Sequence, residues 1–221
     1  MFYRHIVFDL DGTLIDSRQD LADAANAMLA TYGAPPLAVP SIVAMIGEGA
    51  RLLVTRALTA AGVDADPDAA LPRFLDAYDQ RLTATTRLYD GVAETLARLR
   101  DDDARVSVLT NKPQRATDAI LASLGVAPSI DTAIGGDTPY GRKPDPAALH
   151  ALMVQANVPA NQTLMVGDSW VDVSTASAAG IDACLVTYGF GFAAVDDDHR
   201  GRARFAIDSI GALLTLPSSD A

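Results

Sequence analysis

The chain contains little cysteine, little histidine and no long apolar run. Of its 221 residues, one is a cysteine, Cys184, and three are histidines. A single cysteine excludes an internal disulfide, and its apolar neighbours in residues 181–186 predict a small core residue. The histidines lack the spacing of zinc ligands, so no zinc site is expected. Because no run of 18 apolar residues is present, the sequence predicts no transmembrane helix.

Basic residues are also scarce. The chain has 17 lysines and arginines against 28 acidic residues, a net charge of −11 at pH 7. Such a surface repels nucleic acid, so we expect no nucleic-acid partner. Asp9 and Asp11 interrupt any apolar signal-peptide core, and we therefore expect a cytoplasmic protein. The acidic runs 101–103 and 196–198 lie in loop-like sequence and are interpreted as solvated turns.

The most informative stretch is residues 7–17, Val-Phe-Asp-Leu-Asp-Gly-Thr-Leu-Ile-Asp-Ser. An apolar strand is expected to give way to Asp9 and Asp11, whose side chains point to the same side because they lie two residues apart. A divalent cation would relieve the repulsion between them. A carboxylate beside a metal is a competent nucleophile towards phosphorus. The pattern indicates metal-assisted phosphoryl transfer, although a strand-ending turn stays open for this stretch alone.

A second strand is predicted over residues 105–109 from its apolar residues. It ends at Thr110 and Asn111, and Pro113 suits the first turn of a following helix. A hydroxyl and backbone N–H groups at a helix N-terminus can bind phosphate. An ordinary helix N-cap is the alternative for this segment.

Lys143 precedes Pro144, where we expect a helix to begin and to run to about Ala156. The residue before a proline is held extended, so the ammonium can be directed at a site. A positive charge there would neutralise phosphoryl oxygens in the transition state. Taken alone, a lysine near a turn is more often a solvated surface residue.

A further apolar strand, 163–166, is followed by Gly167 and Asp168, with Asp172 four residues on. If a helix starts near Ser169, both carboxylates lie near the same face. Mg²⁺ prefers oxygen ligands and keeps several waters, so few carboxylates suffice. We expect Asp168 to bind the metal directly, and Asp172 to do so directly or through a neighbouring group. Helix capping with an ion pair is the alternative.

These segments together resemble the motifs of the haloacid dehalogenase superfamily of phosphohydrolases, from Phe8 to about Ser209. The resemblance implies that Asp9 is the nucleophile. It implies that Asp11 is the general acid/base and that its backbone carbonyl binds magnesium. The residues that it implies for phosphate binding are Gly12, Thr110, Asn111 and Lys143, and those for the metal are Asp9, Asp11, Asp168 and Asp172.

From residue 87 onward, predicted strands and helices alternate. This order predicts an α/β fold with a doubly wound, Rossmann-like parallel sheet and helices on both faces. The motifs fall at carboxyl ends of strands, where ligands bind in such sheets. The expected helices are 91–100 and 113–124, and the expected strands are 105–109, 132–135, 163–166, 183–187 and 203–207.

Residues 16–86 resemble the helical cap domain that the superfamily inserts after its first strand, with 1–15 and 87–221 as the core domain. Asp16 and Ser17 are expected to cap its first helix. Such a cap would exclude water and read the leaving group. Further cap helices are expected at 41–46, 48–61 and 67–83, and hinges at 16–18 and 85–89.

The cap also carries a clue to the substrate. Gly47, Glu48 and Gly49 precede a helix, where backbone N–H groups could hold a small carboxylate with help from Arg51. An inter-helix turn with Arg51 on the surface is the equal alternative. Glu48 suits an anionic substrate only if it faces away or pairs with Arg51. The segments similar to bacterial phosphoglycolate phosphatases are 45–58, 134–137 and 186–191.

The sequence therefore predicts a Mg²⁺-dependent phosphatase that forms an aspartyl-phosphate, with 2-phosphoglycolate as the expected substrate. A phosphatase for sugar or amino-sugar phosphates and a phosphosugar mutase stay open, and a non-catalytic phospho-ligand binding protein is a remote alternative. We expect a small-molecule phosphate ester as partner, no membrane, and a monomer or homodimer.

Overall fold

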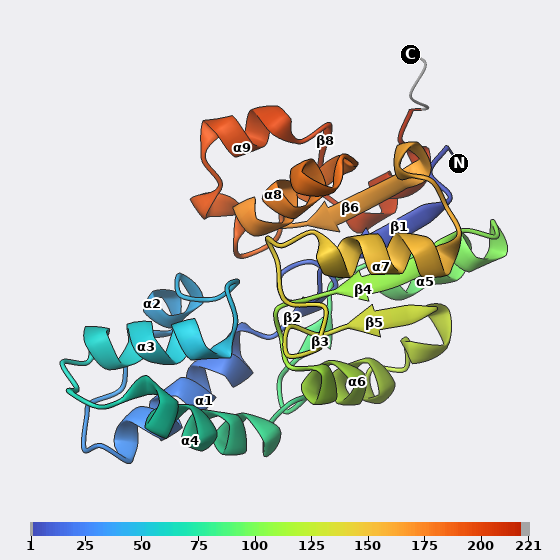
Figure 1. Ribbon diagram of the computed structural model, residues 1–221. Helices are drawn as coiled ribbons and strands as arrows, with labels where there is room; N and C mark the ends of the chain where they lie inside the picture. The colour runs from blue at the N-terminus through green and yellow to red at the C-terminus, as the bar shows by residue number, and fades with distance from the viewer. Residues whose placement is uncertain (1, 218–221) are drawn as a thin grey trace.

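The computed structural model describes residues 2–217, which form an α/β unit with a helical unit beside it (Figure 1). Within these residues the main sheet has six parallel strands in the order β5-β4-β1-β6-β7-β8. The predicted doubly wound α/β fold is thus confirmed. The strands are β1 (His5–Phe8), β4 (Arg105–Leu109), β5 (Thr132–Ile134), β6 (Thr163–Gly167), β7 (Asp182–Val186) and β8 (Phe205–Ile207).

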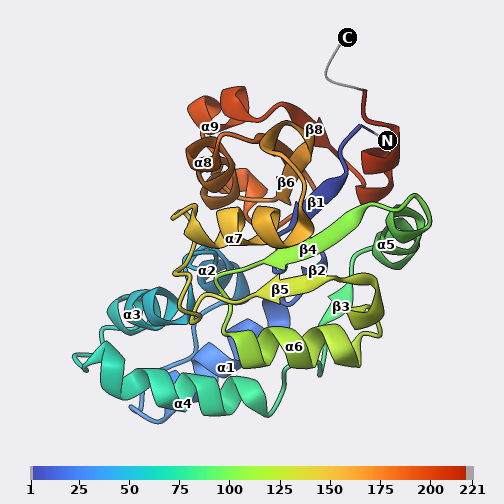
Figure 2. The ribbon, with the colours of Figure 1, turned by 45° about the vertical axis from the view of Figure 1, so that its right-hand side comes forward.

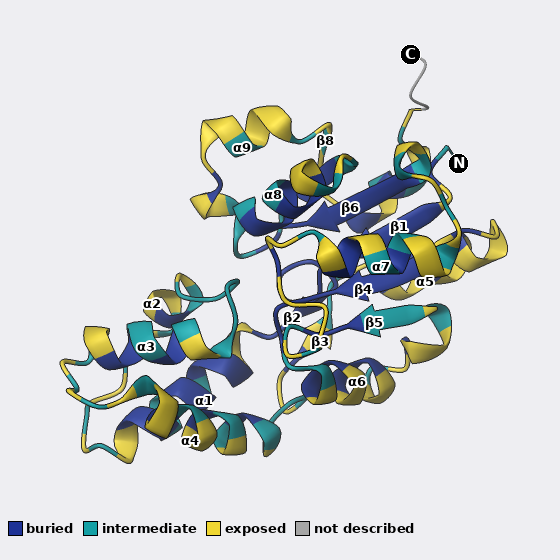
Figure 3. Ribbon diagram, viewed as in Figure 1, coloured by how far each residue is buried: buried dark blue, intermediate teal, exposed yellow. Residues whose placement is uncertain are grey.

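Strand β1 lies in the middle of the sheet between β4 and β6, in register with Val7 opposite Ser107 and Met165. Its residues are all buried, as are those of β6. Apolar strands of this kind suit a parallel sheet because helices cover both of its faces. Figure 3 shows the same burial along the strands and on the inward sides of the helices.

The helices divide between the two faces of the sheet. Alternate residues of a strand point to opposite faces, and Phe8 accordingly packs in the cluster that holds α5 and α6, whereas Val7 packs in the cluster that holds α7 and α8. Figure 2 shows the sheet between α6 and α7. The helices are α5 (Val92–Asp101), α6 (Gln114–Ser123), α7 (Ala147–Ala156), α8 (Trp170–Ala179) and α9 (Asp197–Arg202), with 3₁₀ turns at Ala127–Ser129, Ala160–Gln162, Phe192–Ala194 and Ile210–Thr215.

The helical unit has an apolar core of its own, which includes Met28, Val54 and Phe74. It lies beside the edge of the sheet towards which the strand arrows point (Figure 1). The division of the chain into domains at residues 16 and 86 stays a prediction. The elements of this unit and of its connection are α1 (Arg18–Ala30), α2 (Val39–Val43), α3 (Ala50–Ala60) and α4 (Pro67–Asp79), with the antiparallel strands β2 (Ile15–Asp16) and β3 (Arg87–Leu88).

Buried Asp20, in the first turn of α1, ties this helix to the second connection between the units. Its carboxylate accepts hydrogen bonds from the backbone N–H and the hydroxyl of both Thr85 and Thr86, at 2.8–3.1 Å. Burial would raise the pKa of Asp20, but these hydrogen bonds outweigh it and hold the pKa below its usual range. The hinges at 16–18 and 85–89 stay predictions.

The start of α1 differs from expectation. Ser17 is the N-cap residue of α1 but makes no capping bond with its side chain, because its hydroxyl donates to Asp11 instead. The Asp16 carboxylate accepts a hydrogen bond from the backbone N–H of Arg18 at 3.4 Å, at the first residue of α1, and pairs with the side chains of Arg18 and Arg87.

The helix expected from Pro144 begins three residues later, at Ala147. The Asp145 carboxylate accepts a hydrogen bond from the Ala147 N–H at 2.8 Å, which closes a turn before the helix. The run 196–198, expected to be a solvated turn, begins α9, because Asp196 accepts a hydrogen bond from the His199 N–H. Among residues 2–217, each helix is too short or too polar to cross a bilayer.

Candidate active site

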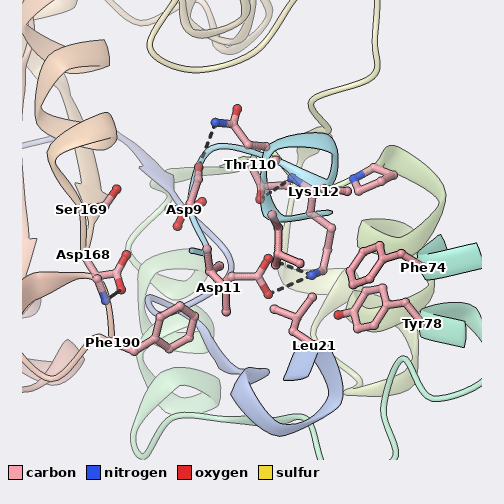
Figure 4. Close-up of a pocket in the computed structure, with 18 of the residues that line it drawn as sticks. Asp9, Asp11, Leu21, Phe74, Tyr78, Thr110, Lys112, Asp168, Ser169 and Phe190 are labelled. Atoms are coloured by element: carbon pink, nitrogen blue, oxygen red, sulfur yellow. Dashed lines mark hydrogen bonds and ion pairs between the residues drawn. The ribbon is translucent and has the colours of Figure 1, made fainter. Parts of the chain in front are cut away.

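The carboxyl ends of β1, β4 and β6 meet at one edge of the sheet, because β1 pairs with both of the others. They place Asp9, Thr110 and Asp168 around one cavity, whose lining residues Figure 4 shows in close-up. Leu53 of α3 and Phe74 of α4 line the same cavity, so the helical unit supplies its opposite wall. The motifs predicted at the carboxyl ends of the strands therefore lie close together in the structure.

Lys143 joins two of the acidic residues. Its ammonium lies 2.7 Å from Oδ1 of Asp9 and 2.6 Å from Oδ1 of Asp172, and the residue is buried. Burial would lower the pKa of Lys143, but the charges of Asp172 and Asp9 outweigh it and raise the pKa. Lys143 is thus a fixed cation beside the expected nucleophile and not a solvated surface residue.

Both oxygens of the Asp172 carboxylate have partners. Oδ1 bonds to Lys143, and Oδ2 accepts hydrogen bonds from the backbone N–H and the hydroxyl of Ser169, at 3.0 and 2.6 Å. These contacts form a capping box at the start of α8. A Cβ at Gly167 would overlap this carboxylate, so glycine is required there. The contacts of Asp172 are those of the alternative given above, in which it caps a helix and forms an ion pair.

Asp168 is held by the loop after β7. Its Oδ2 accepts a hydrogen bond from the Gly191 N–H at 2.7 Å. A Cβ at Gly12 or at Gly189 would overlap the Asp168 side chain, and Gly12 has a positive φ of 90°. Gly12 therefore allows the close approach of Asp168. The contribution of Gly189 was missed from sequence because it depends on a loop far along the chain.

Buried carboxylate oxygens of Asp9, Asp168 and Asp172 lie within 4.8 Å of one another. Burial, together with the neighbouring negative charges, raises the pKa of Asp9 to about 7 and raises that of Asp168 well above its usual range. Lys143 offsets only part of this negative charge. A divalent cation would offset the rest with ligands of the type that Mg²⁺ prefers. The acidic group therefore fits a metal ion.

Asp11 points towards a second lysine, Lys112 (Figure 4). The Lys112 ammonium lies 2.9 and 2.8 Å from the two oxygens of Asp11, and the Ser17 hydroxyl donates to Oδ1 at 2.5 Å. The same ammonium lies 4.7 Å from the centre of the Tyr78 ring. Sequence reasoning gave Lys112 no role, although its place directly after the strand-end pair Thr110-Asn111 could have indicated one.

Thr110 and Asn111 are both buried at the end of β4. The Thr110 hydroxyl oxygen accepts a hydrogen bond from the Lys112 N–H at 3.2 Å. The Asn111 side-chain amide donates to the carbonyls of Gly47 and Lys143, both at 3.0 Å. Asn111 therefore links β4 to the cap loop and to the loop that carries Lys143.

The cap residues expected to bind substrate divide into two groups. Gly47 and Gly49 line the cavity. Arg51 instead forms an exposed ion pair with Asp68 at 2.7 Å, and Glu48 pairs with Arg56 at 2.6 Å. Because these pairs hold both side chains outside the cavity lining, the expected roles of Arg51 and Glu48 find no support in this geometry.

Residues 6–186 match the family model of haloacid dehalogenase-like hydrolases. The chain belongs to this family. It is 44% identical over 192 residues to a phosphoglycolate phosphatase of Rhodospirillum rubrum, a match that covers 84% of this chain and 80% of that relative. It is 41% identical over 192 residues to phosphoglycolate phosphatase 1 of Pseudomonas aeruginosa, over 85% of this chain and 70% of the relative.

Solved structures of the family share the whole architecture. A predicted phosphoglycolate phosphatase from Haemophilus somnus superposes with a TM-score of 0.91 at 29% identity, over 97% of this chain and 98% of that one. The helical unit of α1 to α4 is included in that coverage, since it spans nearly the full chain. Membership of the haloacid dehalogenase-like family confirms the resemblance inferred from the strand-end motifs, whereas the roles of single residues stay predictions.

Proposed function

We propose that the protein is a Mg²⁺-dependent phosphatase that hydrolyses 2-phosphoglycolate to glycolate and phosphate, with a phosphoryl group carried on Asp9. The observation that supports this most is the buried Asp9 carboxylate, 2.7 Å from the Lys143 ammonium, at a cavity that reaches the cap helices. The substrate is proposed from the relatives at 41–44% identity that are named phosphoglycolate phosphatase.

The carboxylates of Asp9 and Asp168, with the backbone carbonyl of Asp11, would hold Mg²⁺. When bound, it supplies positive charge that neutralises the phosphoryl oxygens. Asp172 does not bind the metal in this proposal, because Lys143 and Ser169 occupy both of its oxygens. Its role is to hold the Lys143 ammonium beside Asp9.

The reaction has two halves. In the first, an Asp9 oxygen attacks the phosphorus, the ester P–O bond breaks, and Asp11 gives a proton to the departing oxygen of glycolate. In the second, Asp11 takes a proton from a water molecule that attacks the phosphorus, which releases phosphate and restores the Asp9 carboxylate. The Thr110 hydroxyl, the Asn111 N–H and Lys143 bind the phosphoryl oxygens that do not react.

The cap excludes bulk water from these steps. Leu53 and Phe74 present apolar side chains to the cavity, opposite the acidic group. A small phosphate ester is the proposed partner, and the monomeric or homodimeric state and the cytoplasmic location stay predictions.

Phosphate release tests the proposal. We expect rapid Mg²⁺-dependent release from 2-phosphoglycolate, slower release from sugar phosphates and nucleotides, and none after chelation. Similar rates with all the esters would support the phosphatase activity and contradict 2-phosphoglycolate as its specific substrate. Activity that survives chelation would reject the metal.

A further inference from the structure

The chain contains only two lysines, Lys112 and Lys143, and both are buried at the active site. The other 15 basic residues are arginines, and several of them form ion pairs at the surface. Lys143 has a role in the proposed reaction. Lys112 has none, although burying an ammonium is costly unless it is paired and hydrogen-bonded.

The partner of Lys112 is the group that must exchange protons with the leaving oxygen. Both oxygens of Asp11 accept hydrogen bonds from Lys112, and one also accepts from Ser17. In this arrangement the Asp11 carboxylate points to Lys112, and the acid/base step requires it to face the ester oxygen (Figure 4). The pair must therefore open before Asp11 can act.

Lys112 is also the cationic side chain of the cavity. Among the described residues that line it, the acidic side chains are Asp9, Asp11 and Asp168, and Lys112 carries the positive charge. Arg51 and Arg56 are bound to Asp68 and Glu48 outside the lining. A substrate with a carboxylate beyond its phosphate needs a positive charge in the cavity, and Lys112 supplies it.

Tyr78 of α4 provides a second donor beside Lys112. The residue is 2% exposed and lines the cavity, and the Lys112 ammonium lies 4.7 Å from the centre of its ring. Because a buried tyrosine hydroxyl takes part in hydrogen bonding, Tyr78 can donate to an anion that binds at Lys112. Phe74 stacks against the Tyr78 ring at 5.9 Å between centroids and fixes its direction.

We propose that Lys112 and Tyr78 bind the carboxylate of the substrate, and that Lys112 changes its partner from Asp11 to this carboxylate when the substrate enters. One carboxylate replaces another, so the charge around Lys112 is conserved. Asp11 is then released to face the leaving oxygen. The inference rests on the proposed function, since it requires a substrate that carries a carboxylate.

The exchange couples substrate choice to the rate of the chemical step. An ester without a carboxylate leaves the Asp11–Lys112 pair closed and reacts slowly even when it is bound. The preference for an ester with a carboxylate should therefore appear in kcat as well as in KM. A lysine that only attracted the substrate would change KM alone.

Steady-state kinetics of Lys112→Met test the exchange, with 2-phosphoglycolate and 2-hydroxyethyl phosphate as a pair of esters that differ in the carboxylate. We expect kcat/KM for phosphoglycolate to fall about 100-fold. For the hydroxyethyl ester we expect an equal or higher kcat, because Asp11 no longer has its ammonium partner. Tyr78→Phe should lower kcat/KM about 10-fold for 2-phosphoglycolate alone. Lys112→Arg should retain part of the activity that Lys112→Met loses. Arg98→Met removes a surface cation paired with Asp102 and serves as control.

The outcomes separate the two proposals. A wild-type protein without preference for phosphoglycolate contradicts the proposed function. If wild type prefers phosphoglycolate but Lys112→Met slows the reaction of both esters equally, the exchange alone is contradicted. Lys112 would then only hold Asp11 in position.

A second measurement leaves Lys112 in place and does not depend on turnover. In Asp9→Asn protein labelled with ¹⁵N at lysine side chains, two ammonium signals are expected from the two lysines. Addition of 2-phosphoglycolate with Mg²⁺ should shift the Lys112 signal, identified by its loss in Lys112→Arg, and 2-hydroxyethyl phosphate should not. An equal response to both ligands would contradict the exchange.

Discussion

The ammonium of Lys143 lies 2.7 Å from Oδ1 of Asp9, although 134 residues separate them in sequence. The contact exists because β1 lies in the centre of the sheet and the loop before α7 reaches over its carboxyl end. It places a fixed positive charge beside the proposed nucleophile before any substrate binds. A pre-positioned charge of this kind stabilises a transition state without reorganisation during the reaction.

Replacement of Lys143 should therefore damage both catalysis and stability. We expect Lys143→Met to lower kcat about 1,000-fold and to destabilise the Mg²⁺-free protein by about 3 kcal/mol, because Asp9 and Asp172 lose their buried partner. Phosphate release and denaturant unfolding measure the two effects. A fully active Lys143→Met protein would exclude the proposed role.

Asp168 and Asp172 should respond differently to the same substitution. Asp168→Asn is expected to weaken Mg²⁺ binding by more than about 100-fold, and Asp172→Asn by about 10-fold or less, because Asp172 is bonded to Lys143 and Ser169. Calorimetric titration with Mg²⁺ gives both affinities. Equal losses in the two variants would place Asp172 among the direct ligands.

Glycine at position 189 should be required for the position of Asp168. A Cβ there would overlap the Asp168 side chain and the Gly12 carbonyl, whereas a Cβ at Gly201 meets nothing within 4 Å. We expect Gly189→Ala to cost about 1–3 kcal/mol of stability and to weaken Mg²⁺ binding. Gly201→Ala is the matched control. Unchanged Mg²⁺ affinity in Gly189→Ala would contradict the packing argument.

The stability contributed by Asp20 should depend on pH. Its pKa is held below the usual range in the folded protein, so its contribution is complete above the unfolded pKa of about 3.9 and is lost as pH falls through the folded pKa. Asp20→Asn should cost about 2 kcal/mol at pH 7 and progressively less below pH 4.

Thermal unfolding across this pH range measures the effect. Asp23 lies on the same helix as Asp20 and forms a partly exposed ion pair with Arg81. Asp23→Asn should therefore change stability little at any pH. A constant difference between wild type and Asp20→Asn down to low pH would show that the charge of Asp20 is not what stabilises the connection.

Much of the core was predictable because its signals are local. The strand expected at 105–109 is observed over the same residues, since its apolar residues Val106, Val108 and Leu109 stop where the polar pair Thr110-Asn111 begins. The helix expected to start near Ser169 does so, with Ser169 and Asp172 forming the capping box.

The points that the sequence left open or did not reveal involve side chains whose partners are distant in sequence or open to choice. Arg51 pairs with Asp68 and Glu48 with Arg56, and nothing in the local pattern selects those partners over a substrate. The pairing of Lys112 with Asp11 crosses 101 residues and could be found only from the fold.

In the proposed reaction, Asp9 carries the phosphoryl group during hydrolysis of 2-phosphoglycolate. The most direct test is phosphate release by wild type and by Asp9→Asn, with folding of both checked by circular dichroism and with Mg²⁺ present. We expect rapid release by wild type and a loss of more than about 10,000-fold in the variant. Substantial release by a folded Asp9→Asn protein would contradict it.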